Sequence, residues 1–310
     1  MGKMGMQSKS GLFARGFILF AVFITAFAGL VGCSTSKAAE QGKIIVATKG
    51  FAESDILANA LKLLIENDTE LAVEVKTLDN KLLWEAIGQG DVDAYVEYTG
   101  TALLNILKQE PEFDPEAAYE KTVRLLKENN HLIALDPIGF NNTYVFTVRK
   151  EVADQYGLKT ATQLAEHSGE LVFGSSQEFL NRPDAWPYVE EIYQPKFKEI
   201  KTIQEVSLQY KAAEQKLIDV FLPYSTDSKL LNDQLVTLED DKHVFLPYDA
   251  FPIVREETLN EYPELEKTLN ALAGKIDEAV IQRLNLEVEQ NRRPPLDVAK
   301  EWLKSEGFIQ

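Results

Sequence analysis

Four of the 11 tyrosines lie at predicted strand ends or in the turns just after them: Tyr98, Tyr144, Tyr224 and Tyr248. Two of them, Tyr224 and Tyr248, each end a Phe-Leu-Pro-Tyr string. Because proline cannot donate to a sheet ladder, we expect each string to end a strand and to turn its tyrosine out of the sheet. Several aromatic faces gathered there could hold a quaternary ammonium group by dispersion and by cation–π attraction, about 0.5–2 kcal/mol per ring. Position alone leaves open that these are ordinary half-buried tyrosines.

Residues with catalytic or metal-binding chemistry show no recognisable pattern. None of the three histidines lies at metal-ligand spacing from another histidine or from a cysteine: His131, His167 and His243. The chain has no nucleophile elbow, phosphate-binding loop or dinucleotide fingerprint. We therefore expect no cofactor, no metal and no enzymatic activity. An enzyme that uses Asp or Glu pairs from distant segments remains the alternative, and turnover of bound ligand would reveal it.

The single cysteine, Cys33, follows a secretory leader. Residues 1–15 are basic, residues 16–29 form an apolar run, and Leu30-Val31-Gly32-Cys33 resembles the cleavage box of bacterial lipoproteins. The apolar run is short for a membrane span, and no basic stop-transfer cluster follows it. We predict a lipoprotein signal peptide over 1–33, a tether over 34–42, and lipidation of Cys33 that anchors an extracytoplasmic protein to the bacterial cell membrane.

Composition limits the remaining possibilities. The chain has 310 residues, 45% hydrophobic and 26% charged, which is globular and longer than one typical domain. Its formal charge is −17, and the leader contributes three bases and no acid, so the rest of the chain carries −20. A surface this acidic argues against nucleic-acid binding and against adsorption to anionic lipid by charge alone.

Short β-rich runs alternate with helical patterns along the chain. The first half predicts strands over 43–48, 71–77 and 94–97, with helices over 54–67, 81–87 (closed by Gly88) and 115–129. This βαβαβ order implies a parallel sheet with helices on both faces. The second half predicts strands over 141–149, 170–174, 198–203 and 219–222, with helices over 162–167, 186–193 and 208–216. The tail from Glu256 is nearly all helix.

No flexible linker separates the two halves. We therefore predict an α/β chain of two domains joined by paired crossovers and a hinge, with domain I over 43–138 and 243–310 and domain II over 139–242. Ligands of such sheets bind at the carboxyl ends of the strands, which places the site in the cleft between the domains.

From Lys43 to Gln310 the sequence resembles the substrate-binding proteins of ABC importers for glycine betaine, choline, carnitine and related osmoprotectants. Six ordered motifs carry the resemblance: Lys49-Gly50-Phe51-Ala52-Glu53, Glu97-Tyr98-Thr99-Gly100-Thr101, Phe140-Asn141-Asn142-Thr143-Tyr144, Arg182 with Asp184, Tyr224-Ser225-Thr226-Asp227, and Pro247-Tyr248-Asp249-Ala250-Phe251-Pro252.

The resemblance implies a type II periplasmic-binding-protein fold and a function in transport. It implies capture of a quaternary ammonium solute and its delivery to the membrane permease and ATPase subunits of an ABC importer. It also implies that the four tyrosines form a cage around the ammonium group. The ligand carboxylate would meet Lys49, Arg182 and the hydroxyl of Thr101.

Two features of the implied site bear on the ligand. The family usually has x-Asp-Gly after the arginine, whereas Ala185 replaces that glycine here. Lys49, which some members lack, favours ligands with an anionic end, and Arg182 would repel a simple cation, so we expect betaines rather than choline. Three alternatives remain: Lys49 as a solvated lysine, Arg182 in a surface or interdomain ion pair, and Thr101 as a helix cap. A polar amino-acid receptor would need an acid aimed at an ammonium N–H, which four tyrosines do not supply.

Overall fold

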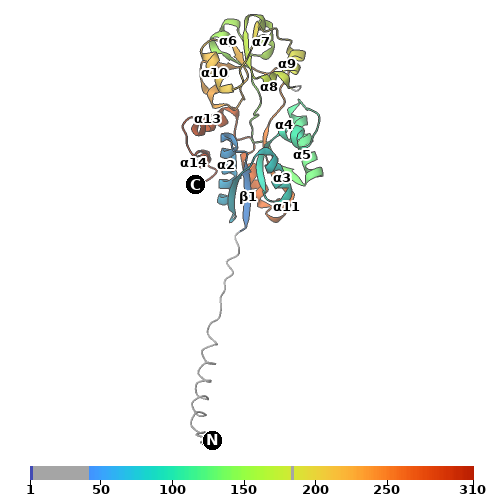
Figure 1. Ribbon diagram of the computed structural model, residues 1–310, viewed down its shortest axis with the longest axis vertical. Helices are drawn as coiled ribbons and strands as arrows, with labels where there is room; N and C mark the ends of the chain where they lie inside the picture. Colours follow the sequence, from blue (N-terminus) through green and yellow to red (C-terminus); the bar gives the residue numbers. More distant parts are fainter. Residues whose placement is uncertain (3–41, 183–184) are drawn as a thin grey trace. The chain divides into compact units, whose positions relative to one another are not determined.

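A computed structural model describes residues 1–2, 42–182 and 185–310. The segment Gly42–Gln310 forms one compact unit that contains two five-stranded sheets. We call each sheet, with the helices packed on it, the first and the second lobe (Figure 1). No helix of the described ranges is long and apolar enough to span a bilayer. Cys33 and nearly all of the predicted signal peptide and tether lie outside the described residues.

The sheet of the first lobe has the strand order β2-β1-β3-β10-β4. β1 is parallel to β2 and β3, whereas β10 runs antiparallel to β3 and β4. The strands are β1 (Lys43–Thr48), β2 (Ala72–Thr77), β3 (Ala94–Tyr98), β4 (Leu132–Ala134) and β10 (Ala250–Arg255). The expected parallel sheet was therefore wrong in part, because a strand from the C-terminal half inserts between two strands of the N-terminal half.

The sheet of the second lobe repeats this plan with the order β7-β6-β8-β5-β9. β6 is parallel to β7 and β8, and β5 is antiparallel to β8 and β9. The strands are β5 (Thr147–Arg149), β6 (Val172–Ser175), β7 (Glu199–Thr202), β8 (Val220–Phe221) and β9 (Leu235–Thr237). In each sheet the antiparallel insertion is the first strand reached after the chain crosses from the other lobe.

Helices surround both sheets (Figure 1). The first lobe contains α2 (Ala52–Asp68), α3 (Asn80–Gln89), α4 (Thr99–Thr101), the π-helix Ala102–Ile106, α5 (Pro115–Asn130), α11 (Glu256–Glu261), α12 (Glu264–Leu269), the 3₁₀ turn Asn270–Leu272, α13 (Glu278–Glu289) and α14 (Pro295–Ser305). The second contains α6 (Lys150–Tyr156), α7 (Ala161–His167), the 3₁₀ turn Ser168–Glu170, α8 (Gln177–Asn181), α9 (Trp186–Tyr193), α10 (Val206–Glu214) and the 3₁₀ turn Ser228–Leu231.

Local chemistry explains where several helices begin and end. Asp114 accepts a hydrogen bond from the backbone N–H of Ala117, and Pro115 occupies the first turn of α5, as the sequence predicts. Gly90, with φ of +86°, closes α3 in the left-handed conformation. The expectation that Gly88 ends this helix was wrong, because Gly88 lies inside its last turn.

The core of the first lobe forms where the apolar face of α2 meets the sheet. Leu57, Leu61 and Ile65 are fully buried on this helix and share one cluster with Ile44 and Val46 of β1. Burying such a side chain completely is worth about 1.5–3 kcal/mol, so this contact supplies much of the free energy that fixes β1. The carboxyl end of β1 leads directly into the Lys49–Glu53 segment.

Two chain crossings join the lobes, and they contact each other. Asn141 and Asp249 form an antiparallel bridge, the backbone N–H of Asn142 donates to the Tyr248 carbonyl at 3.0 Å, and Asn141 Oδ1 accepts from the Tyr248 N–H at 2.7 Å. The strand expected over 141–149 is therefore only Thr147–Arg149, because its first residues pair across the crossings. The expectation that the second Phe-Leu-Pro-Tyr string ends a strand was also wrong, because Tyr248 precedes β10 and no strand ends there.

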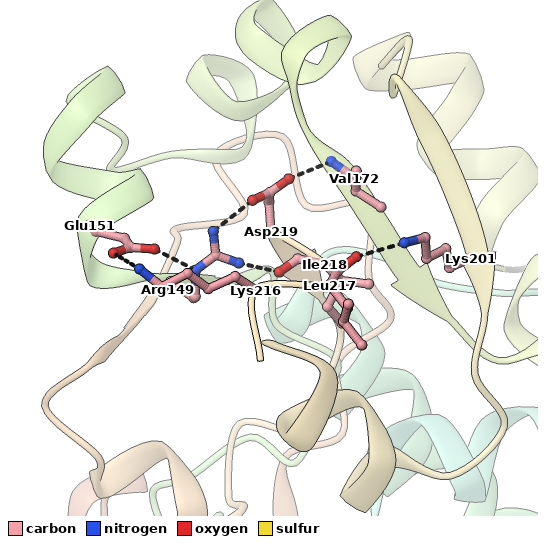
Figure 2. Close-up of polar contacts among 8 residues, drawn as sticks. All are labelled: Arg149, Glu151, Val172, Lys201, Lys216, Leu217, Ile218 and Asp219. Carbon is pink, nitrogen blue, oxygen red and sulfur yellow. Dashed lines mark hydrogen bonds and ion pairs between the residues drawn. The ribbon is translucent and has the colours of Figure 1, made fainter. Parts of the chain in front are cut away.

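A polar network fixes the entrance to β8 (Figure 2). Asp219 accepts from Arg149 Nη2 and from the Val172 backbone N–H, both at 2.8 Å. Glu151 accepts from Arg149 Nε at 3.0 Å and from Lys216 Nζ at 2.8 Å. Because β8 is only two residues long and leads through Pro223 to Tyr224, we infer that this network helps to set where that tyrosine leaves the sheet.

Candidate functional site

Two cavities adjoin at Tyr224, which lines both of them. One has a volume of about 460 Å³ and is bordered by α2, by the crossing at Asn142 and by second-lobe residues near Thr226. The other, of about 340 Å³, lies in the second lobe, and Tyr144 and Arg182 line it together with Tyr224. Tyr224 is 44% exposed, which is unusual for a large aromatic side chain and leaves its face accessible from the cavities.

Tyr144 and Tyr224 form a stacked pair. Their ring centroids lie 4.9 Å apart with 25° between the planes, and their hydroxyl oxygens are 3.3 Å apart. A backbone bridge joins the two residues, and the edge of Phe179 supports the Tyr144 ring at 5.0 Å. Burial raises the pKa of Tyr144, so this ring faces the cavity as a neutral aromatic surface. This arrangement can form one wall of a cation site.

Tyr98 and Tyr248 belong to the first lobe and pack on one hydrophobic cluster. Tyr98 ends β3, is only 6% exposed and donates its hydroxyl to Glu53 Oε1 at 2.6 Å. Burial, together with the charge of Glu53, raises its pKa well above the usual value. The ring of Tyr248 lies against Gly100, where a Cβ atom would come within 2.7 Å of Tyr248 Cε1. Gly100 therefore leaves the space that this ring needs.

Lys49 is buried and already paired. Its side chain is 6% exposed, and its ammonium forms an ion pair with Glu97, whose side chain is 3% exposed. The ammonium also lies 4.9 Å from the centroid of the Tyr98 ring and 5.8 Å from that of Tyr95. In this structure a cation of the chain itself thus occupies a position over one predicted cage ring.

Arg182 follows α8 directly and lines the same cavity as the stacked tyrosines. Its positive charge acts on Tyr144, where it offsets part of the rise in the pKa of that phenol. Residues 183–184 lie outside the described residues, and Ala185 donates its backbone N–H to the Arg182 carbonyl at 3.1 Å. The φ of Ala185 is −128°, so position 185 does not need the left-handed conformation that favours glycine.

Thr101 ends α4 and is half-buried, three residues after Tyr98. It makes no capping hydrogen bond with its side chain. The segment after Thr101 is a π-helix over Ala102–Ile106, and Thr101 continues into it with helical φ and ψ instead of capping it. Insertions of this kind often occur at functional sites.

Sequence reasoning missed the most connected polar residue of the site, Glu53. It is 2% exposed and accepts hydrogen bonds from Tyr98 Oη at 2.6 Å, from Asn142 Nδ2 at 3.0 Å and from Asn285 Nδ2 at 3.3 Å. Burial raises its pKa above the usual value, and the hydrogen bonds offset part of that rise. The only signal in the sequence was its place in the Lys49–Glu53 motif, which does not show that its partners come from three distant segments.

Metal binding finds no support in the described ranges. Among residues 42–182 and 185–310, no group of three or more His, Cys, Asp or Glu side chains is placed to hold an ion. Aromatic rings line both cavities beside polar and charged groups. The smaller cavity holds Arg182 together with Glu178 and Glu205, and the larger one holds the buried carboxylate of Glu53.

Comparison with known proteins gives consistent matches over nearly the whole chain. Residues 42–305 match the family described as the substrate binding domain of the ABC-type glycine betaine transport system. The carnitine transport binding protein OpuCC of Listeria monocytogenes is 36% identical over 94% of this chain and 97% of its own. The ergothioneine transport permease/ergothioneine binding protein EgtU of Helicobacter pylori is 32% identical over 87% of this chain and 49% of its own.

Solved structures extend the agreement to the fold. A structure described as a glycine betaine/carnitine/choline ABC transporter superposes with a TM-score of 0.80 at 34% identity, covering 86% of this chain and all of that one. The expected fold, a periplasmic-binding-protein type with two α/β sheets, is therefore confirmed. From the family match, the relatives and the shared fold, we conclude that this chain belongs to the family of substrate-binding domains of ABC-type glycine betaine transport systems.

Proposed function

We propose that this protein captures a quaternary ammonium solute of the betaine type between its two lobes and delivers it to the permease of an ABC importer. The observation that carries this proposal is the stacked pair of Tyr144 and Tyr224, which shares a cavity of about 340 Å³ with Arg182. Aromatic faces suit a cation that has no N–H groups, and a guanidinium suits a carboxylate. A betaine carries both groups in one small molecule.

In this proposal the tyrosines divide between the lobes. Tyr144 and Tyr224 line the second-lobe cavity. Tyr98 and Tyr248 pack on the hydrophobic cluster of the first lobe, from which they would supply the opposite wall. Arg182 is the main partner of the ligand carboxylate, and Thr101 adds a hydroxyl. Lys49 contributes its charge only when it exchanges Glu97 for the ligand carboxylate, because its ammonium is already paired in this structure.

The relatives support this assignment by what they are named for. One is a carnitine transport binding protein, and others are glycine betaine-binding proteins from Pseudomonas aeruginosa and Escherichia coli. Carnitine and glycine betaine both join a trimethylammonium group to a carboxylate. We infer that this chain takes a ligand of the same class and has no catalytic role.

A ligand panel tests the proposal directly. Calorimetry on the chain from Ser34 should show binding of glycine betaine and carnitine, weaker binding of choline, and no binding of L-serine as a polar amino-acid control. Arg182→Ala should remove about 3–5 kcal/mol of affinity for glycine betaine and much less for choline, because only the betaine has a carboxylate to lose. Equal losses for both ligands would refute the assigned role of Arg182, and binding of none of the quaternary ammonium compounds would refute the function.

We further propose that the protein is extracytoplasmic and is held at the membrane by lipid on Cys33, which lies outside the described residues. Membrane attachment and solute binding would then lie on separate segments. Cys33→Ala should release the protein into the soluble fraction while calorimetry shows unchanged ligand affinity. If the variant stays acylated and in the membrane fraction, the proposed anchor is wrong.

A further inference from the structure

The carboxylate of Glu53 lies where the two lobes meet. It lines the larger cavity together with Tyr224, whereas Arg182 lines the smaller one. It comes from the first turn of α2 and is 2% exposed. A buried carboxylate loses the hydration that stabilises its charge, so it needs compensating donors. Four side chains supply them. Tyr98 Oη donates at 2.6 Å, Asn142 Nδ2 at 3.0 Å and Asn285 Nδ2 at 3.3 Å, and the side chain of Thr226 also hydrogen-bonds this carboxylate.

These donors come from four separate parts of the fold, one of which is the second-lobe segment that contains Thr226. Tyr98 ends β3, Asn142 lies in the first crossing, and Asn285 lies on α13. The Asn285 amide also donates to the backbone carbonyl of Thr226 at 3.0 Å. Since Thr226 lies two residues after Tyr224, a short chain of hydrogen bonds runs from a cage tyrosine of the first lobe to the segment that carries a cage tyrosine of the second.

Helix α13 holds this second-lobe segment at further points. Gln282 Nε2 donates to the Ser225 carbonyl at 2.6 Å, and Ser228 Oγ donates to Glu289 Oε2 at 2.7 Å. Asn285 itself is 4% exposed, and its Oδ1 has no hydrogen-bond partner among the described residues. The amide is therefore held in place by its Nδ2 group alone, through Glu53 and Thr226.

Charged groups surround Glu53 without neutralising it. On the side of β1 and β3, Lys49 and Glu97 are paired with each other. Asp227, Lys229 and Glu289 line the same cavity as Glu53. Burying the carboxylate of Glu53 costs free energy of desolvation. In return, its hydrogen bonds hold the side chains of Tyr98 and Asn285 in place.

We propose that Glu53 is a positioning residue for ligand capture: it fixes the ring of Tyr98 and, through Asn285, sets the Thr226 segment, so that tyrosines from both lobes meet the ligand together. This inference rests on the proposed function, because it assumes that the tyrosines bind the ligand. Glu53 itself need not touch the solute.

A double-mutant cycle on glycine betaine affinity tests the link to Tyr98. Glu53→Gln should weaken binding about tenfold or more, since one hydrogen bond to a charged group is lost or misaligned. Tyr98→Phe keeps the aromatic face but removes the hydroxyl. The double variant should bind no worse than Glu53→Gln alone, because both changes break the same contact. The matched control is Tyr144→Phe, whose hydroxyl faces Tyr224, and its effect should add to that of Glu53→Gln. Additive losses for Tyr98→Phe would overturn the proposal.

A second measurement needs no ligand and separates this inference from the proposed function. In the free protein, NMR would follow the Cζ signal of Tyr98, assigned by its loss in Tyr98→Phe, and the side-chain amide signal of Asn285. Both signals should shift with pH at a common midpoint above the usual range of a glutamate, and both shifts should vanish in Glu53→Gln.

Persistent shifts in that variant, or different midpoints for the two signals, would overturn the role of Glu53 even if betaine binds. If the wild type binds no quaternary ammonium compound while the two signals still titrate together, the proposed function fails and the structural link stands. Circular dichroism of Glu53→Gln shows whether the variant folds. If it does not, the common midpoint in the wild-type protein decides.

Discussion

Asp249 lies at the crossing between the lobes, one residue after Tyr248, and its ionisation should make the protein less stable as pH rises. The side chain is half-buried, and Glu278 at the start of α13 adds a second negative charge nearby. Burial, followed by the charge of Glu278, raises the pKa of Asp249 to about 6 from an ordinary value of 3.8. The backbone N–H of Asp249 itself offsets a smaller part.

Proton linkage gives the direction in which the free energy of unfolding changes with pH. The folded state holds the proton more tightly than the unfolded chain does, so this group contributes its full stability below pH 4 and loses it as pH rises through about 6. A pKa difference of about 2 corresponds to about 3 kcal/mol. Because the side chain keeps partial contact with water, screening reduces the expected effect to about 1–2 kcal/mol.

Asp249→Asn removes the ionisation and keeps the shape. The variant should match the wild type at pH 4 and exceed its free energy of unfolding by about 1–2 kcal/mol at pH 8. Urea unfolding followed by tryptophan fluorescence at pH 4, 6 and 8 measures this difference. Asp91→Asn, which changes an exposed carboxylate, is the matched control and should show no such pH dependence.

Glu278→Gln provides an independent check, because Gln can still accept the hydrogen bond that Glu278 Oε1 receives from the Asn141 N–H at 3.1 Å. Removing this charge should reduce the loss of wild-type stability between pH 4 and pH 8. If Asp249→Asn is instead less stable than the wild type at pH 8, the ionised carboxylate makes a stabilising contact, and the reasoning from its raised pKa is refuted.

Three further changes test contacts described above. Lys49→Met should lower the free energy of unfolding in urea by about 3–5 kcal/mol, because it leaves Glu97 buried without its cation. Adding Glu97→Gln should recover most of that loss. A loss below about 1 kcal/mol for Lys49→Met would contradict a buried ion pair. Gly100→Ala should weaken glycine betaine binding about tenfold by displacing Tyr248. The control Gly88→Ala has no atom within 4 Å of the new Cβ and should leave the affinity unchanged. Equal affinities for the two variants would show that Tyr248 is not held by its contact with Gly100. Asp219→Ala should lower the free energy of unfolding by about 2 kcal/mol because Arg149 and the Val172 N–H lose their shared acceptor, and an unchanged urea midpoint would contradict that role.

The sequence predicted the elements whose signals are local. The helix from Pro115 and the strand Lys43–Thr48 form as expected, because a capping aspartate and a continuous apolar run act within a few residues. The strands β4, β9 and β10 were not predicted. Two of them are three residues long, and the third becomes a strand by inserting between partners more than 100 residues earlier in the chain.

For the candidate site, too, the sequence predicted the local features but missed the contacts between distant segments. The motifs identified Lys49 and Tyr98 as candidates, but the sequence does not show that Lys49 pairs with Glu97 or that Tyr98 donates to Glu53. Both contacts join segments more than 40 residues apart, and the pairing depends on how β1, β3 and α2 pack. A motif gives the type of side chain, whereas the partner of that side chain is set by tertiary structure.

The position of β10 between β3 and β4 has a consequence for the order of folding. The second sheet uses only residues 147–237, so it can complete itself from one continuous stretch. The first sheet keeps a gap between β3 and β4 until Ala250–Arg255 arrives, and it must close a loop of more than 100 residues to fill that gap. When the chain is synthesised from its N-terminus, the sheet of the first lobe would therefore stay incomplete until β10 emerges. The second lobe would be the first to form all of its native strand pairs.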